Sequence, residues 1–142
     1  MPNPEAPRSS LRAWFISPSS RLLGELSGLI TSHVPGSTVH QIAAYVDDAE
    51  LSKDLASRHP NVCFLDVTSD REQGLRILGS LQKLDGNVGV VAVLSTNDPD
   101  FILRCLRQGA VDFMVPPFTA DHLNAALAKM ARIQGSEEAF HK

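Results

Sequence analysis

Four polar segments of this chain each follow an apolar run, and they hold most of the side chains that could carry chemistry. Ser17-Pro18-Ser19-Ser20 follows the first run, Asp66-Val67-Thr68 the third, Ser95-Thr96-Asn97 the fourth and Pro116-Pro117 the fifth. In an open α/β sheet the functional crevice lies beyond the carboxyl ends of the strands. We therefore expect the chemistry of this protein to depend on these four segments.

Asp66 and the hydroxyl turn at residues 17–20 permit different interactions. A carboxylate that ends a buried strand can cap the turn or helix that follows it, and the Ser95 hydroxyl can do the same after its own strand. Ser17 is a good N-cap for the next helix, and Pro18 suits its first position. The free N–H groups and dipole of that helix end favour an anion, so the turn is also a candidate phosphate site.

The cysteines and histidines follow no metal-binding or disulfide pattern. Cys63 and Cys105 lie far apart, each inside an apolar run and neither in a Cys-x-x-Cys pair. This arrangement predicts reduced thiols rather than a disulfide framework or a zinc site. The five histidines lack the spacing of metal ligands, so we predict no metal site from them.

Composition limits the classes of partner. The chain has 142 residues, of which 43% are hydrophobic and 20% charged, and this is enough for one domain with its own core. Its net charge of −3, without blocks of like charge, argues against nucleic acid as a partner. No apolar stretch is long enough for a membrane span, and the first residues lack the order of a signal peptide. We predict a soluble, cytoplasmic protein without membrane insertion.

Strands and helices are predicted to alternate along the chain. Short apolar runs predict five strands, at residues 11–16, 38–45, 61–66, 88–94 and 112–115. Leucine-rich periodic stretches predict five helices, which begin at the caps Ser17, Asp47 or Asp48, at Gly74, at Asn97 or Asp98, and at Thr119. Gly109 is the expected left-handed stop of the fourth helix.

The strand pattern predicts the fold class. The strands are apolar throughout, which indicates burial on both faces of a parallel sheet. With helices between them, they predict one doubly wound α/β domain built from right-handed βαβ units. Residues 1–10 hold three prolines and no apolar periodicity, so they are expected to be a disordered lead-in. The domain is predicted at residues 11–134, and residues 135–142 are read as a tail or the start of a linker.

Residues 11–133 resemble the receiver domain of bacterial response regulators, which has the CheY-like fold. Four motifs in the same order carry the resemblance: Leu65-Asp66 with Gly74-Leu75, Val93-Leu94-Ser95, Gln108-Gly109-Ala110-Val111-Asp112-Phe113, and Pro116-Pro117-Phe118. The resemblance implies a flavodoxin-like five-stranded sheet in the order 2-1-3-4-5. It also implies a phosphoacceptor at Asp66, a switch aromatic at Phe113 and a cis peptide bond before Pro117.

The sequence departs from this family at three positions around the phosphoacceptor. The resemblance places Ser17 and Pro18 where receivers have the acidic pair that binds Mg²⁺, and Pro116 where they have a lysine that holds the phosphoryl oxygens. Magnesium prefers carboxylate and water oxygens, and phosphoryl transfer depends on positioning and charge neutralisation. Of the usual pocket, Asp66, Ser95 and Phe113 remain, with Thr68 beside them. The sequence therefore resembles a degenerate receiver.

Two further expectations come from resemblance. In receivers, the fourth helix, fifth strand and fifth helix form the usual dimerisation and output surface, and here this surface would carry Arg104, Arg107, Lys129 and Arg132. More narrowly, residues 94–110 resemble the N-terminal receiver-like domain of TadZ/CpaE-type pilus assembly proteins. In that family the domain precedes a MinD-like ATPase and serves in localisation and self-association.

These observations lead to one functional hypothesis and two alternatives. The hypothesis is a non-catalytic, receiver-like regulatory domain that acts through protein partners, possesses no cofactor and is not phosphorylated by the usual route. The first alternative is a true phosphorelay receiver that is phosphorylated on Asp66 with Mg²⁺. The second is binding of flavin mononucleotide or phosphate at residues 17–20. Flavin sites of this architecture also need loop glycines and aromatics around the ring, whereas Trp14 and Tyr45 lie inside predicted strands.

Overall fold

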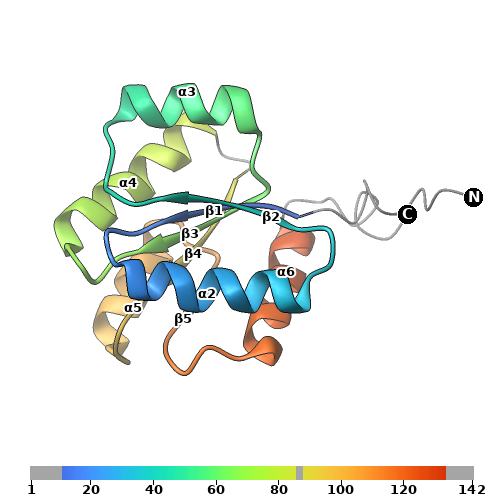
Figure 1. Ribbon diagram of the computed structural model, residues 1–142. Helices are drawn as coiled ribbons and strands as arrows, with labels where there is room; N and C mark the ends of the chain where they lie inside the picture. Colours follow the sequence, from blue (N-terminus) through green and yellow to red (C-terminus); the bar gives the residue numbers. More distant parts are fainter. Residues whose placement is uncertain (1–10, 86–87, 134–142) are drawn as a thin grey trace, which may run out of the picture.

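The structure, a computed structural model, describes residues 11–85 and 88–133 (Figure 1). The predicted lead-in at residues 1–10 and tail at residues 135–142 lie outside the described residues. Strands and helices alternate as predicted. They are β1 (Arg12–Ile16), α2 (Ser20–His33), β2 (Thr38–Ile42), α3 (Asp48–Arg58), β3 (Val62–Asp66), α4 (Arg71–Leu84), β4 (Gly89–Val93), α5 (Pro99–Arg107), β5 (Asp112–Met114) and α6 (Ala120–Ile133).

The five strands form one parallel sheet in the order β2-β1-β3-β4-β5, which confirms the predicted fold class. Figure 1 shows α3 and α4 on one side of the sheet and α2 and α6 on the other. Successive strand residues point to opposite faces. Trp14 and Ile16 of β1 therefore join the core cluster that includes α3, α4 and α5, whereas Phe15 packs with α2 and α6.

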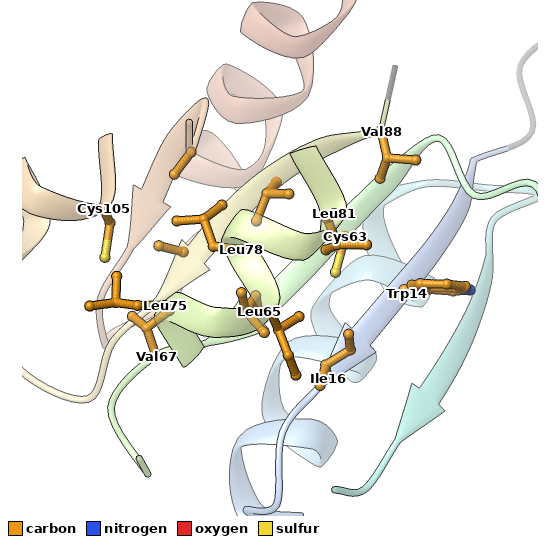
Figure 2. Packing of buried hydrophobic residues seen from close by; sticks show 14 of the residues in the cluster. Trp14, Ile16, Cys63, Leu65, Val67, Leu75, Leu78, Leu81, Val88 and Cys105 are labelled. Atoms are coloured by element: carbon orange, nitrogen blue, oxygen red, sulfur yellow. The ribbon is translucent and has the colours of Figure 1, made fainter. Parts of the chain in front are cut away.

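Helix α4 packs directly on β3, the strand that ends at Asp66. Figure 2 shows Leu75, Leu78 and Leu81 along the side of α4 that faces Cys63 and Leu65 of the sheet. Full burial of a leucine side chain contributes about 1.5–3 kcal/mol. This packing fixes the end of β3 relative to the beginning of α4, where the candidate site lies.

Local signals predicted most helix caps. Asp47 accepts a hydrogen bond from Glu50 N at 2.9 Å, and Asp98 accepts one from Phe101 N at 3.3 Å. The hydroxyl of Thr119 accepts a hydrogen bond from His122 N at 3.2 Å. Gly109 has a φ of 120° after α5, as expected of a stop residue. Among the described residues, no helix is long and apolar enough to cross a membrane.

Three boundaries differ from the predictions by more than one residue. The N-cap of α2 is Ser19 and not Ser17, because the Ser17 hydroxyl interacts with Asp66 instead, as described below. Pro18 therefore precedes the helix and does not occupy its first position. Helix α4 begins at Arg71, before Gly74, since Asp70 caps it by accepting a hydrogen bond from Gln73 N. Strand β2 ends at Ile42, so Tyr45 lies in the loop before α3 and not inside a strand.

Candidate functional site

Asp66 is the last residue of β3 and lies at the carboxyl edge of the sheet. Its exposed fraction is 0%, and its strand lies between β1 and β4 in the sheet. Ile16 pairs with Leu65, so Ser17, the residue after β1, lies next to Asp66. Gly74 lets α4 approach the loop closely, since a Cβ there would lie 2.8 Å from Val67 Cα. The parallel register thus brings one carboxylate and a hydroxyl into a buried pocket.

The Asp66 carboxylate accepts five hydrogen bonds from protein groups. Its Oδ2 accepts from Ser17 Oγ at 2.7 Å and from Ser69 Oγ at 2.5 Å. Its Oδ1 accepts from Thr68 N at 2.8 Å, Thr68 Oγ1 at 3.0 Å and Ser69 N at 3.1 Å. The two backbone donors confirm that Asp66 caps the turn that follows β3. Both oxygens are therefore already engaged within the protein.

These hydrogen bonds determine the protonation of Asp66. Burial by itself raises the pKa of the carboxyl, but the hydrogen bonds from Ser69, Ser17 and Thr68 stabilise the charged form more strongly. The net result is a pKa below the ordinary value of an aspartate. Asp66 is thus an anion at neutral pH whose charge is balanced by donor dipoles.

Two residues of this site, Ser69 and Tyr45, were missing from the sequence prediction. Ser69 supplies two of the five donors. The Tyr45 hydroxyl donates to the backbone carbonyl of Asp66 at 2.7 Å. Burial and the neighbouring charge of Asp66 raise the pKa of Tyr45. Ser69 could have been found by extending the Asp66-Val67-Thr68 segment by one residue, whereas Tyr45 was hidden by the overlong second strand.

The other predicted pocket residues have different surroundings. Pro18 and Pro116 are exposed and carry no donor atom, and Ser95 is exposed and forms none of the hydrogen bonds to Asp66. The peptide bond between Pro116 and Pro117 is cis, as predicted. Phe113 is half-buried and contacts the His122 ring edge-on, with centroids 5.8 Å apart.

The hydroxyl turn at residues 17–20 is engaged by the protein itself. Ser17 Oγ accepts a hydrogen bond from Ser19 N at 3.0 Å while it donates to Asp66. Ser19 Oγ accepts from Leu22 N at 3.3 Å and so caps α2. Two of the three serine hydroxyls in the turn therefore already have protein partners.

The predicted interface residues lie on α5 and α6. Arg104 and Arg107 are exposed in the last turn of α5. Lys129 of α6 forms an ion pair with Asp112 at 3.6 Å, so it links α6 to β5. The side chain of Arg132 lies outside the described residues.

A comparison of the sequence with known families assigns the chain to one of them. The family described as response regulator receiver domain matches residues 27–128, which is well over half of the sequence. The chain belongs to this receiver family. Transcriptional regulatory protein MalR of Bacillus subtilis is 28% identical over 113 residues, covering 80% of this chain but only 47% of MalR. Chemotaxis protein CheY of Listeria monocytogenes is 27% identical over 104 residues, covering 73% of this chain and 87% of CheY.

Solved structures agree on the receiver fold. A response regulator from Thermotoga maritima superposes with a TM-score of 0.71 at 19% identity, covering 87% of this chain and 98% of that one. NtrX from Brucella abortus superposes with a TM-score of 0.73 at 19% identity, covering 91% of this chain and 28% of NtrX. This chain therefore corresponds to a complete receiver fold, and it spans less than half the length of MalR and NtrX.

The residues around Asp66 do not fit the magnesium ion that receivers use. Mg²⁺ needs carboxylate or carbonyl oxygens with free lone pairs in octahedral geometry. Among the described residues no group of three or more histidine, cysteine or acidic side chains could hold a metal ion. Asp70, the next acid along the chain, accepts from Gln73 N as the cap of α4. Ser17 directs its hydroxyl proton at Asp66, at the position where the resemblance placed the acidic pair of receivers.

Proposed function

We propose that this receiver domain is a non-catalytic regulatory module of the cytoplasm that acts through protein contacts, without phosphorylation by the magnesium-dependent route. The observation that carries this proposal is the set of five hydrogen bonds that occupies both carboxylate oxygens of Asp66. A phosphoacceptor needs one oxygen free to attack phosphorus. Here Oδ2, the oxygen bonded only to side-chain hydroxyls, is held by Ser17 and Ser69.

Both the occupied nucleophile and the lack of positive charge around it raise the barrier to phosphorylation. A hydrogen bond to a charged group contributes about 1.5–3 kcal/mol, so freeing Oδ2 from two hydroxyls adds to the barrier. Phosphoryl transfer depends almost entirely on positioned cations that neutralise the equatorial oxygens. Pro18 and Pro116 supply no such charge. The proposal is therefore supported by the two hydroxyls bound to Oδ2 and by the uncharged side chains at positions 18 and 116.

The experiment is incubation of the domain with Mg²⁺ and acetyl phosphate, followed by intact mass spectrometry. We expect no addition of a phosphoryl group under conditions that fully modify an ordinary receiver assayed in parallel. The Asp66→Asn variant is the matched control, because it keeps the pocket but removes the acceptor. Stoichiometric, Mg²⁺-dependent modification that is absent from D66N would contradict the proposal and support the alternative of a true phosphorelay receiver. That alternative is favoured by the relatives, which bear the names of transcriptional and chemotaxis regulators.

The partner surface that we propose is formed by α5, β5 and α6. Leu103 on α5 has an exposed fraction of 45%, and Arg107 lies one turn further on the same helix. Arginine is enriched in protein interfaces, and Leu103 would add apolar area to such a contact. Sedimentation analysis of Leu103→Glu tests it: self-association that is retained in L103E excludes this face. Leu84→Glu, at the other exposed large apolar residue among those described, is the matched control.

The narrower resemblance to TadZ/CpaE-type proteins supports a more specific partner. We propose that the domain takes part in pilus assembly as a domain that precedes a MinD-like ATPase and serves in localisation and self-association. The support is the sequence of residues 94–110, which begins at the end of β4 and includes α5. A two-hybrid assay of the domain against a second copy of itself is expected to give a signal that L103E abolishes. A signal that is absent, or that L103E leaves unchanged, would remove this assignment.

A further inference from the structure

A cavity of about 250 Å³ opens beside β1 and β2, under the end of α3. Its lining includes Arg12, Trp14, His40 and Arg58. Trp14 and His40 are paired across β1 and β2, so their side chains lie on the same face of the sheet. Arg12 begins β1, whereas Asp66 ends β3. Because the strands are parallel, the cavity lies toward their amino ends and the candidate site lies at their carboxyl ends.

Trp14 brings an unsatisfied hydrogen-bond donor to this cavity. Its exposed fraction is 1%, and its Nε1 is buried without a hydrogen-bond partner among the described residues. Figure 2 shows the indole nitrogen at the end of the ring that lies away from Leu65 and Leu78. Nearly all buried N–H groups in folded proteins have an acceptor. Nε1 has less than 1 Å² of accessible surface, so an acceptor in the cavity reaches it once a side chain of the lining moves aside.

Two arginines contribute further donors. Arg12 Nε donates to the carbonyl of His59 at 2.7 Å, which holds its guanidinium against the end of α3. Its Nη groups form no hydrogen bond with the described part of the chain. Arg58, the last residue of α3, forms no ion pair there either. Guanidinium groups present paired N–H donors that match the two oxygens of a carboxylate.

The surrounding charges favour a single negative charge on the ligand. Burial and the positive charge of Arg58 lower the pKa of His40, although Asp54 opposes this, so His40 is neutral at neutral pH. The Asp54 carboxylate and the partial negative charge at the end of α3 offset part of the charge of the two arginines. A doubly charged phosphate is better accommodated at the beginning of a helix than at its end.

The size and walls of the cavity limit the body of the ligand. Thr38, Ser57 and Pro60 also line it, whereas Ala13 and Val39 have their side chains in the core cluster on the opposite face of the sheet. A volume of about 250 Å³ is below the roughly 300–1,000 Å³ of sites for drug-sized molecules, so the cavity suits a small ligand. A compact body with one carboxylate matches both the size of the cavity and its donors.

We propose that this cavity binds a small organic monocarboxylate, whose oxygens accept hydrogen bonds from Arg12, Arg58 and Trp14 Nε1. The proposal does not depend on the fate of Asp66, so it stands or falls separately from the proposed function. Binding of the carboxylate gives the domain a way to respond to a metabolite at the amino ends of the strands, remote from the phosphoacceptor position at their carboxyl ends.

The experiment uses the fact that Trp14 is the only tryptophan in the chain. Its indole N–H gives a single cross-peak in a ¹H–¹⁵N correlation spectrum, and hydrogen bonding shifts that peak directly. We expect isobutyrate and benzoate to shift it saturably, while chloride and inorganic phosphate at equal ionic strength do not. Affinity is expected to fall about tenfold in Arg58→Gln, since a charged bidentate contact is lost, and to be partly restored in Arg58→Lys.

The matched control is Arg107→Gln, which removes an exposed arginine of α5 that does not line the cavity. It is expected to bind both carboxylates with unchanged affinity. Absence of a saturable indole shift in the wild type would overturn the proposal. So would equal binding by R58Q and R107Q, with the dispersion of the amide spectrum showing that both are folded. A shift with phosphate of the same affinity would overturn the assignment to a monocarboxylate.

Discussion

At the scale of single residues, the pair formed by Ser17 and Asp66 shows how one side chain changes the chemistry of its neighbour. The Ser17 hydroxyl, 2.7 Å from Asp66 Oδ2, donates a hydrogen bond to it, whereas a carboxylate in that position has no proton to donate and would need a cation shared with Asp66. The hydroxyl stabilises the lone anion without any metal. The hydrogen bond from Ser17 therefore explains how the buried Asp66 carboxylate stays charged without a second acid beside it.

Replacing Ser17 by aspartate tests this interpretation. Two carboxylates would then lie in hydrogen-bond contact inside a buried pocket, and one of them would lack a donor. We expect the free energy of unfolding to fall by about 3 kcal/mol without divalent ions. Excess MgCl₂ should raise the melting temperature of Ser17→Asp but not of the wild type, because only the variant offers a pair of acidic ligands. Ser17→Asn is the neutral control, and a magnesium response in it would contradict the argument.

The depressed pKa of Asp66 also makes a prediction about pH. A carboxyl whose pKa is lower in the folded than in the unfolded state stabilises the fold above the unfolded value of about 3.9. That stabilisation disappears as the pH falls through the folded pKa. We therefore expect Asp66→Asn to be less stable than the wild type by about 2 kcal/mol at neutral pH. The difference should shrink progressively below about pH 4 in urea unfolding. A difference independent of pH would show that packing, and not charge, determines the effect.

At the scale of elements, the sequence predicted most of what depends on neighbours along the chain, the Asp70 cap of α4 being the exception, and missed what depends on loop conformation. Caps such as Asp47 and Asp98 act on N–H groups three residues away, so the local pattern was sufficient. Tyr45 reaches the Asp66 carbonyl across 21 positions, and only the fold reveals this. The misplaced cap at Ser17 has the same origin, because its true partner lies 49 positions away.

The packing of α4 against the Asp66 loop predicts opposite effects for two glycines of one helix. A Cβ at Gly74 would lie 2.8 Å from Val67 Cα, a contact that backbone atoms can relieve only by moving. At Gly79, no neighbouring atom lies within 4 Å of the point that a Cβ would occupy. We expect Gly74→Ala to lower the free energy of unfolding by about 1–3 kcal/mol. Gly79→Ala should raise it by up to about 1 kcal/mol through helix propensity. Equal effects in urea unfolding would contradict this account of the packing.

At the scale of the whole molecule, the parallel sheet and its two helical layers follow from apolar strands and short connections, whereas the strand order was implied by the resemblance to receivers. The contacts that link β5 to α6 were not predictable from the sequence. Asp112 is paired with Lys129 at 3.6 Å, and Phe113 contacts the His122 ring, so two successive residues of β5 are tied to α6. These contacts hold β5 and α6 together without any change at Asp66.

A signalling receiver needs a ligand that binds one of two conformations more tightly. Because both oxygens of Asp66 are engaged by protein donors, Mg²⁺ and beryllofluoride would have to displace these donors before they could favour a second state. We expect the amide resonances of Phe113, His122 and Lys129 to keep their positions when both reagents are added in excess, as measured by ¹H–¹⁵N correlation. Shifts near Ser17 alone would indicate weak binding without switching. Shifts that extend from Asp66 to Phe113 would instead show that the molecule retains the coupled two-state response of an ordinary receiver, because a local hydrogen-bond change cannot reach β5 unless its contacts with α6 rearrange.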